Sequence, residues 1–314
     1  MIDAGLRPIS MNLWWSDAPA FARELVTSFG EFGFAVVAAP ELDQDVIDQA
    51  TRAAKRFFAL PESEKRRWHT PGQAGQRGYT PFGIETAKGA QRPDLKEFWH
   101  MGRDLPPGHP NRAFMLENVW PDQPEGFHEA VSRLYGALDE LGRELLQATA
   151  LGLGLPALWF EDKATSGDSV LRLAHYPPIS PDAAGVRAGA HEDINVITLL
   201  LGAEEAGLEI LTRDGQWLAV NPEPGSVVVN VGDMLQRLTN HRLPSTTHRV
   251  VNPPPDRRGV ARLSTPFFVH FEPAFEIATL PACVDAAHPD LYPQPITTYD
   301  YLQQRLREIG LKQA

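Results

Sequence analysis

Cysteine is almost absent from this sequence of 314 residues, where Cys283 is the single example. One thiol cannot form a disulfide within the chain, and it cannot build a cysteine-based zinc site. A nucleophilic cysteine needs a nearby base, and no residue close to Cys283 in the sequence suggests one. We therefore interpret Cys283 as a structural thiol. The low cysteine content fits a reducing compartment, and we expect a cytoplasmic protein.

Long apolar runs and an excess of positive charge are also missing. No apolar run approaches the roughly 20 residues that span a bilayer. Residues 1–15 lack the basic segment followed by an apolar stretch that marks a signal peptide. The net charge of −11 disfavours nucleic acid and anionic membranes as partners. The expected partner is a small molecule, and no feature of the sequence predicts an oligomeric state.

The chain contains a helix-rich first part. Apolar residues recur at helical spacing in three segments, and a short apolar run and a charged helix lie between them. The segments are a helix at 18–33, a strand at 34–39, a helix at 41–60, a charged helix at 61–69 and a long helix at 125–155. Residues 70–125, which are rich in glycine and proline, are expected to form long loops.

After residue 168, short β-type runs alternate with turn residues. The expected strands are 170–176, 195–201, 208–212, 217–220, 226–231, 248–252 and 262–271, and a last helix covers 301–310. This spacing is typical of an antiparallel sandwich or barrel. We predict a mainly β fold with flanking helices (α+β). It would be a single domain over 1–314, with a helix-rich part at about 1–165, a barrel core at about 166–275 and a helical tail.

The stretch "HEDINVITLL" places charged residues directly before an apolar run. If "HED" opens the strand, His191 and Asp193 share one face and Glu192 points the other way. His248 opens another β-type run. Two imidazoles and one carboxylate form the donor set that suits non-haem Fe(II) and leaves positions open for oxygen and a co-substrate. By spacing alone a hydrogen-bonded histidine–aspartate pair or a zinc site stays possible.

A possible anion-binding pair follows in "ARLST". Arg262 and Ser264 stand two residues apart, on one face of a predicted strand. A guanidinium can bind a carboxylate through two parallel hydrogen bonds, and a serine hydroxyl can add a third. An iron site with two neutral histidines and one aspartate keeps positive charge and favours an anionic chelator.

Longer phrases of the sequence carry a family resemblance. Besides "HEDINVITLL", they are "RDGQWLAVNPEPG", "VVNVGDMLQRLTN", "STTHRVVNP" and "RLSTPFF", together with "FGEFGFAVV", "FFALPESEK" and "GYTPFG…DLKEFWH" in the first half. In this order, over nearly the whole chain, the sequence resembles the isopenicillin N synthase-like branch of the 2-oxoglutarate/Fe(II)-dependent dioxygenases.

The resemblance implies a double-stranded β-helix, or jelly roll, with iron near its open end. It implies that His191, Asp193 and His248 are the iron ligands and that Arg262 and Ser264 bind the distal carboxylate of 2-oxoglutarate. In "LAHYPP", Tyr176 matches a family position whose hydroxyl is a candidate contact of the co-substrate. The family's usual asparagine two residues earlier is Ala174 here, which leaves room for an altered co-substrate pocket.

Four further residues are candidate substrate contacts. Arg77, Tyr79 and Phe82 lie in "QRGYTPFG", a loop that could cover the mouth of the barrel. Phe268 follows Arg262 at even spacing, so its ring could reach the cavity. For each residue the alternative is a packed structural role.

The sequence thus predicts an oxidoreductase that uses Fe(II), 2-oxoglutarate and O₂ to hydroxylate or desaturate an unidentified small molecule. No catalytic residue beyond the metal ligands is expected. Two alternatives remain at this point: an iron oxidase that uses O₂ without 2-oxoglutarate, as isopenicillin N synthase does, and a non-catalytic jelly roll that only binds a ligand.

Overall fold

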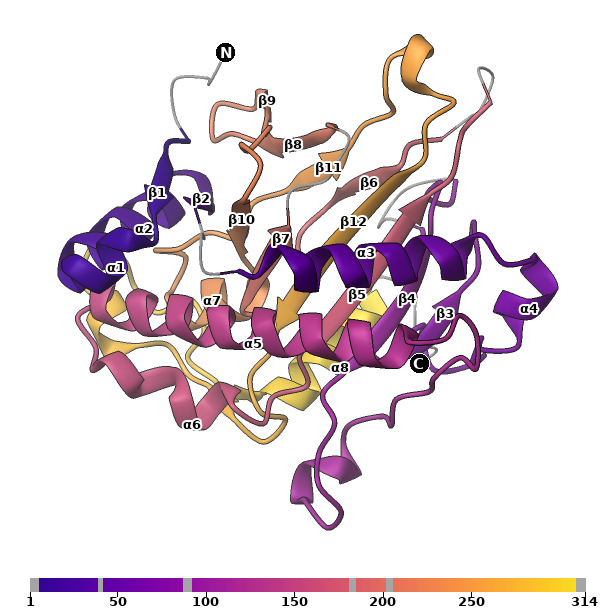
Figure 1. Ribbon diagram of the computed structural model, residues 1–314. Coiled ribbons are helices and arrows are strands. Elements are labelled where there is room, and N and C mark those ends of the chain that lie inside the picture. The colour runs from indigo at the N-terminus through magenta and orange to yellow at the C-terminus, as the bar shows by residue number, and fades with distance from the viewer. Residues whose placement is uncertain (1–5, 39–41, 87–91, 181–184, 202–205, 309–314) are drawn as a thin grey trace.

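Two β-sheets and a layer of helices make up the computed structural model of the protein, which describes residues 6–38, 42–86, 92–180, 185–201 and 206–308 (Figure 1). Within these residues the larger sheet has the strand order β1-β2-β10-β7-β12-β5-β4-β3. Its strands are β1 (Pro8–Ser10), β2 (Phe34–Ala38), β3 (Gly78–Thr80), β4 (Glu97–Gly102), β5 (Val170–Tyr176), β7 (Ile197–Leu201), β10 (Ser226–Val231) and β12 (Arg262–Val269).

The smaller sheet has the order β6-β11-β8-β9. Its strands are β6 (Ala188–His191), β8 (Leu208–Leu211), β9 (Trp217–Ala219) and β11 (His248–Val250), and a separate pair joins β13 (Glu276–Ile277) to β14 (Ile296–Thr297). Every pairing except that of β1 with β2 is antiparallel. This arrangement of two antiparallel sheets is the predicted jelly roll.

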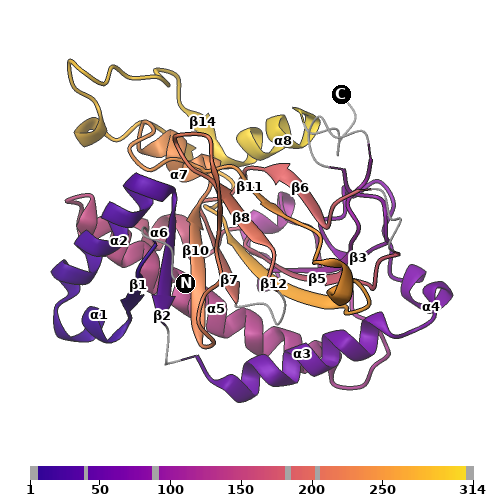
Figure 2. The same cartoon turned by 90° about the horizontal axis from the view of Figure 1, so that it is seen from above.

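Helices cover one face of the larger sheet (Figures 1 and 2). The described α-helices are α1 (Asn12–Ser16), α2 (Ala18–Phe32), α3 (Gln44–Phe58), α4 (Glu62–Arg66), α5 (Phe127–Gly152), α6 (Glu161–Ala164), α7 (Asp233–Leu238) and α8 (Thr298–Glu308). Of these, α2, α3 and α5 form the covering layer, whereas α8 lies on the other side of the sheet. The long helix α5 packs directly on β7 and β12, where a Cβ built on Gly142 would lie 3.0 Å from Val269 and 3.9 Å from Leu199. The main hydrophobic core lies between α2, α3, α5 and this face of the sheet.

The opposite face of the larger sheet faces the smaller sheet. Phe34, Val36 and Val228 from the larger sheet are buried against Leu208 and Ile210 from β8. Because side chains alternate along a strand, each central strand sends one set of residues to the helices and the other set into the space between the sheets. The candidate metal site lies at one end of this inner space.

Local sequence explains how α2 begins and ends. Asp17 caps the first turn by accepting a hydrogen bond from the Ala20 amide at 3.0 Å, and Pro19 occupies the first turn, where its missing N–H costs nothing. The helix ends at Gly33, whose φ of +68° suits a residue without a side chain. A Cβ there would also collide with Thr246, so the chain can turn into β2 only with glycine at this position.

The expectation of long loops over 70–125 was wrong in part. The strands β3 and β4 lie in this segment and extend the larger sheet beyond β5. All six residues of β4 are buried, so the strand lacks the alternation of apolar and polar residues by which strands are recognised. The helix-rich first half therefore also supplies strands to the main sheet.

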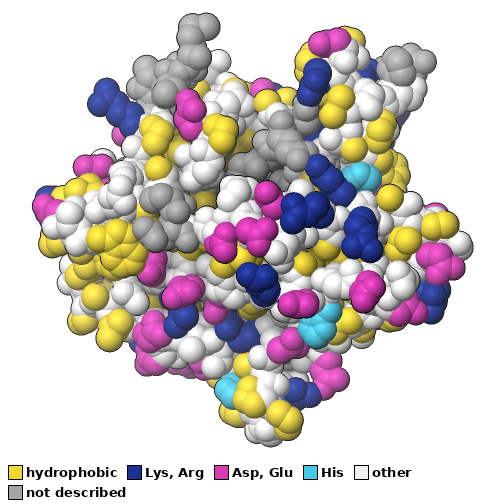
Figure 3. Space-filling model, in the orientation of Figure 1, with side chains coloured by type: hydrophobic (Ala, Val, Ile, Leu, Met, Phe, Trp, Pro, Cys, Tyr) yellow, Lys and Arg dark blue, Asp and Glu magenta, His cyan; other side chains and the backbone are white. Residues whose placement is uncertain are grey.

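The surface mixes charges of both signs. Acidic and basic side chains are interspersed over the face shown in Figure 3. In the described part of the chain, no helix combines the length and apolar character needed to cross a membrane.

Candidate metal centre

The pairing of two short strands brings the two candidate histidines together. His191 ends β6, His248 begins β11, and the two are direct partners across this antiparallel pair. Opposite residues of an antiparallel pair project to the same side of the sheet. The two imidazole ring centres lie 4.4 Å apart, and Phe34 from the larger sheet packs edge-on against His248.

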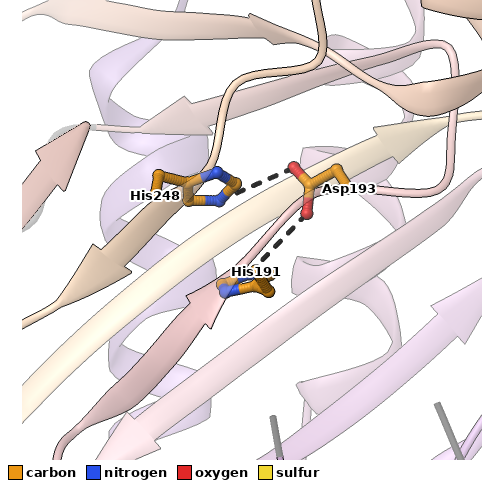
Figure 4. A group of neighbouring side chains, drawn as sticks. All are labelled: His191, Asp193 and His248. Carbon is orange, nitrogen blue, oxygen red and sulfur yellow. Dashed lines mark ion pairs between the residues drawn. The ribbon is translucent and has the colours of Figure 1, made fainter. Parts of the chain in front are cut away.

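Asp193 is the third member of the metal-binding group, and it lies outside the strand in which it was expected. "HED" does not open a strand, because His191 is the last residue of β6 and Asp193 lies in the turn between β6 and β7. The turn still directs its carboxylate toward the histidines (Figure 4). The distances are 3.8 Å from Nε2 of His191 to Oδ1 and 3.9 Å from Nε2 of His248 to Oδ2. One donor atom from each residue lies within 4.8 Å of the others.

Backbone carbonyls set the tautomer of both histidines. Nδ1 of His191 lies 2.8 Å from the Gly189 carbonyl, and Nδ1 of His248 lies 3.1 Å from the Thr246 carbonyl. Since a carbonyl oxygen can only accept, each Nδ1 carries the proton, and each Nε2 presents a lone pair to the centre of the group. Burial, with the neighbouring His248, lowers the pKa of His191 to about 4. His191 is therefore neutral at pH 7, as a metal ligand must be.

Two hydrogen bonds hold the Asp193 carboxylate. Its Oδ2 accepts from Oγ1 of Thr198 at 2.6 Å and from Nδ2 of Asn230 at 2.8 Å. Thr198 and Asn230 are direct partners on β7 and β10. Burial acts to raise the pKa of Asp193, but the two histidines and these two hydrogen bonds outweigh burial and lower it. The side chain is thus an ionised carboxylate with a defined orientation.

This donor set fits a ferrous ion. Among the residues that the structure describes, His191, Asp193 and His248 form the one group of histidine, cysteine or acidic side chains close enough to hold a metal. Two neutral imidazoles and one carboxylate suit non-haem Fe(II), and three protein donors leave coordination positions for a co-substrate and O₂.

The residues expected to bind 2-oxoglutarate lie on the same inner surface. Arg262 is the direct partner of Tyr176, and Ser264 is the partner of Ala174, across β12 and β5. The Arg262 guanidinium lies 5.0 Å from the centre of the Tyr176 ring, and all four residues are buried. Ala174 leaves only a methyl group opposite Ser264.

A cavity of about 520 Å³ opens beside the metal-binding group. Its walls include His191, Asp193 and two of the four candidate substrate residues, Arg77 and Phe268. The wall is rich in charge. The other charged or histidine side chains that line it are Glu85, Asp94, Lys96, His100, Asp168, Arg172, Glu192, His270 and Arg305.

The other two candidates do not line this cavity. Tyr79 is fully buried in the main core, and its hydroxyl donates to Glu97 or Glu62, at 2.5 and 3.0 Å. Alternation along β3 explains the error, because Tyr79 pairs with Trp99 and both face the helices. Phe82 lies outside the cavity wall with 43% of its surface exposed.

Sequence reasoning missed a group of buried and partly buried charges in the cavity wall. Arg172 forms two contacts with Glu85, at 3.1 and 3.2 Å, and its guanidinium lies 4.2 Å from the centre of the Phe98 ring. Lys96 contacts Glu85 at 2.6 Å and Asp94 at 2.9 Å. The available signal was a charged residue inside the apolar strand "VLRLAHY", where an unpaired charge would be costly.

A jelly roll that carries two histidines and an aspartate at one end of its inner space is the architecture of a non-haem iron oxygenase. Comparison with known proteins agrees. Residues 8–123 match the family model described as "non-haem dioxygenase in morphine synthesis N-terminal". Residues 167–271 match the model of the 2OG-Fe(II) oxygenase superfamily. The chain belongs to the 2-oxoglutarate/Fe(II)-dependent oxygenases.

Individual relatives support the same assignment. The 2-oxoglutarate-Fe(II) type oxidoreductase hxnY of Emericella nidulans is 34% identical over 282 residues, which cover 86% of this chain and 79% of hxnY. A crystal structure of a putative 2OG-Fe(II) oxygenase family protein from Caulobacter crescentus is 57% identical with a TM-score of 0.92, over 98% of this chain and 100% of that one. A full-length Neurospora crassa protein, crystallised in complex with alpha-KG and thymine, is 28% identical with a TM-score of 0.86, over 98% of both chains.

These findings confirm the predicted activity class. The protein is an Fe(II)- and 2-oxoglutarate-dependent dioxygenase that uses O₂. Of the predicted alternatives, an oxidase without 2-oxoglutarate and a non-catalytic jelly roll fit these relatives less well, because the relatives are named as 2-oxoglutarate enzymes.

Proposed function

We propose that His191, Asp193 and His248 hold the ferrous ion of this dioxygenase. The observation that carries the proposal is the convergence of two Nε2 lone pairs and one ionised carboxylate within 4.8 Å. A ferrous ion held by these residues would supply O₂ activation coupled to the decarboxylation of 2-oxoglutarate to succinate and CO₂. Thr198 and Asn230 keep the Asp193 carboxylate in place.

Arg262, Ser264 and Tyr176 bind 2-oxoglutarate in this proposal. The distal carboxylate of the co-substrate accepts two hydrogen bonds from the Arg262 guanidinium and one from the Ser264 hydroxyl. Tyr176, which lies beside Arg262, contributes its hydroxyl. The support is their shared place on the inner face of β12 and β5, in the protein interior, where a charge-assisted hydrogen bond is strong.

The substrate is a small polar molecule that lies between the metal site and the charged wall of the cavity. Phe268 offers an apolar surface on β12, and Arg172, 5.4 Å from its ring centre, offers N–H donors. The charges of this wall are balanced in pairs, Arg172 and Lys96 with Glu85 and Asp94, and Arg77 with Asp168. A balanced wall suits an uncharged or zwitterionic substrate better than a long apolar one. Hydroxylation is the default outcome, and desaturation or ring closure starts in the same way.

The whole chain acts as one oxygenase unit in this account. β1 to β4 of the first half join the same sheet as β5, β7, β10 and β12. The net charge of −11 and the cavity of about 520 Å³ favour a small-molecule substrate over nucleic acid or a membrane surface. The single cysteine favours a cytoplasmic location.

Succinate formation, measured together with O₂ consumption, tests this function. With Fe(II) and 2-oxoglutarate we expect slow succinate release, which a polar substrate accelerates with one succinate formed per O₂. Nucleobases and amino acids form the first panel, with thymine included because the Neurospora crassa relative binds it, and apolar acids serve as comparison. Arg172→Met should lose the acceleration. O₂ consumption that needs no 2-oxoglutarate would refute the proposed co-substrate.

A further inference from the structure

The carboxylate of Asp94 contacts the backbone next to a proposed metal ligand. Its Oδ1 accepts a hydrogen bond from the Gly189 amide at 2.9 Å. The carbonyl of the same Gly189 accepts the Nδ1 proton of His191 at 2.8 Å. Asp94 is buried, with 4% of its surface exposed. One peptide segment thus connects a buried acid to the imidazole of His191.

The backbone of β6 needs such a contact because β6 is an edge strand. It pairs with β11 on one side and, within the described residues, has no strand on the other. The pairing with β11 is also irregular between His248 and Val250. An edge strand of four residues with an irregular partner holds its backbone weakly. Asp94 therefore supplies, from outside the sheet, a hydrogen bond that a neighbouring strand would otherwise supply.

A chain of buried and partly buried charges fixes Asp94 in turn. Lys96 lies 2.9 Å from its second oxygen and 2.6 Å from Glu85. Glu85 is held by Arg172. Both carboxylate oxygens of Asp94 are thus engaged, one by the Gly189 amide and one by an ammonium group, so the side chain has a single orientation.

We propose that Asp94 is a positioning residue for the metal site: it holds the backbone amide of Gly189 so that the carbonyl of the same residue keeps the His191 imidazole in the tautomer and orientation of a metal ligand. The inference rests on the proposed role of His191 as a ligand. Partners that orient a metal-binding histidine contribute about 10- to 100-fold to metal affinity. Asp94 acts one peptide farther away, through the carbonyl that receives the Nδ1 proton.

A pair of double variants isolates the hydrogen bond from the charge. Asp94→Asn with Lys96→Met keeps an oxygen acceptor for the Gly189 amide and removes both charges. Asp94→Leu with Lys96→Met removes both charges and the acceptor, with a side chain that branches at the same carbon. Since apolar residues can replace a buried ion pair at little cost, both proteins should fold. Near-native circular dichroism and melting temperature of the metal-free proteins check this.

The readout is Fe(II) affinity under anaerobic conditions, together with the visible absorption band of the Fe(II)–2-oxoglutarate complex. We expect the asparagine variant to bind Fe(II) within a few-fold of wild type, and the leucine variant to bind about tenfold more weakly or worse, with a shifted band. Asp168→Asn is the matched control, because Asp168 is an acid of the same cavity wall that pairs with Arg77 and, within the described residues, forms no hydrogen bond or ion pair with β6. Its Fe(II) affinity should stay at the wild-type value.

Two results would contradict the inference, and they are distinguishable. Equal Fe(II) affinity and an equal band in the two double variants would show that Asp94 has no positioning role, while the proposed function stands. Failure of the wild-type protein to bind Fe(II) would overturn the proposed function, and the inference with it.

Discussion

Single residues set the chemistry of the inner surface, and Arg262 is the clearest case. Its planar guanidinium can bind both oxygens of a carboxylate, whereas a lysine ammonium acts as a point charge. We expect Arg262→Lys to weaken 2-oxoglutarate binding by roughly tenfold or more, since charge-assisted hydrogen bonds contribute about 1.5–3 kcal/mol each. Calorimetric titration of the Mn(II)-loaded protein measures this.

The metal site gives the control for this variant. Arg262 lies on β12, whereas His191 and His248 lie on β6 and β11 and Asp193 follows β6, so Mn(II) affinity should not change. Unchanged 2-oxoglutarate affinity in the lysine variant would assign Arg262 a different role.

Lys65 illustrates the cost of a buried charge on the other side of the sheet. Its ammonium lies 2.6 Å from the Glu97 carboxylate, and both side chains are buried. Burial acts to raise the pKa of Glu97, but hydrogen bonds from His175, Lys65 and Tyr79 outweigh burial and lower it. A carboxyl group with a lowered pKa in the folded state stabilises the protein above its unfolded pKa, and this contribution is lost as the pH falls through the folded value.

Lys65→Met should therefore destabilise the protein in a pH-dependent way. Removing one partner of a buried pair costs about 3–5 kcal/mol at neutral pH. The folded-state pKa of Glu97 rises in the variant, so the loss relative to wild type should shrink as the pH is lowered and Glu97 becomes protonated. Urea unfolding between about pH 7 and pH 5 measures the difference. If the variant lost the same unfolding free energy at every pH, the unpaired Glu97 carboxylate would not be the cause of the destabilisation.

At the scale of helices and strands, periodic patterns predicted the structure well where one face is buried. The strands β5 and β10 have the predicted bounds, and the helix predicted at 18–33 agrees with α2 to one residue. The strand β4 was missed because all its residues are buried and no alternation remains. Local sequence cannot indicate that both faces of such a segment will be covered, since the covering residues come from distant parts of the chain.

The metal site shows a second limit of local reasoning. The three proposed ligands were recognised by their residue types, but the argument that His191 and Asp193 share a strand face was wrong. The two lie on either side of a strand end, and Thr198 and Asn230 orient the carboxylate from strands of the other sheet. The charged wall with Arg172 was not predicted, because its partner Glu85 is distant in the sequence.

The end of α2 offers a test at the element scale. Gly33 has a φ of +68°, and a Cβ there would lie 2.1 Å from Oγ1 of Thr246 and 2.5 Å from the Pro244 carbonyl. We expect Gly33→Ala to lower the free energy of unfolding by about 1–3 kcal/mol, because backbone strain and the collision act together. Gly126→Ala is the control for strain alone, since its φ is +79° but no described atom lies within 4 Å of the added carbon. Equal losses in the two variants would exclude the collision as a cause.

For the whole molecule, the shared sheet predicts cooperative behaviour. Strands of the first half form both edges of the larger sheet around strands of the second half, where β2 pairs with β10 and β4 pairs with β5. We expect one thermal unfolding transition. Metal and co-substrate bind only the folded protein, so Mn(II) and 2-oxoglutarate should raise its melting temperature. Ligand at roughly 100 times its dissociation constant adds about 2.7 kcal/mol. Two calorimetric transitions, of which Mn(II) and 2-oxoglutarate raise the temperature of only one, would contradict the expectation that the chain unfolds as a single cooperative unit.

The most direct test of the account is an anaerobic titration with Fe(II) and 2-oxoglutarate, followed by visible absorption. The account predicts a weak charge-transfer band that saturates at one Fe(II) per chain in the wild-type protein. It predicts no band in His191→Ala, Asp193→Ala or His248→Ala, each with near-native circular dichroism. A saturating wild-type band that survives unchanged in any of the three variants would show that the ferrous ion is held elsewhere.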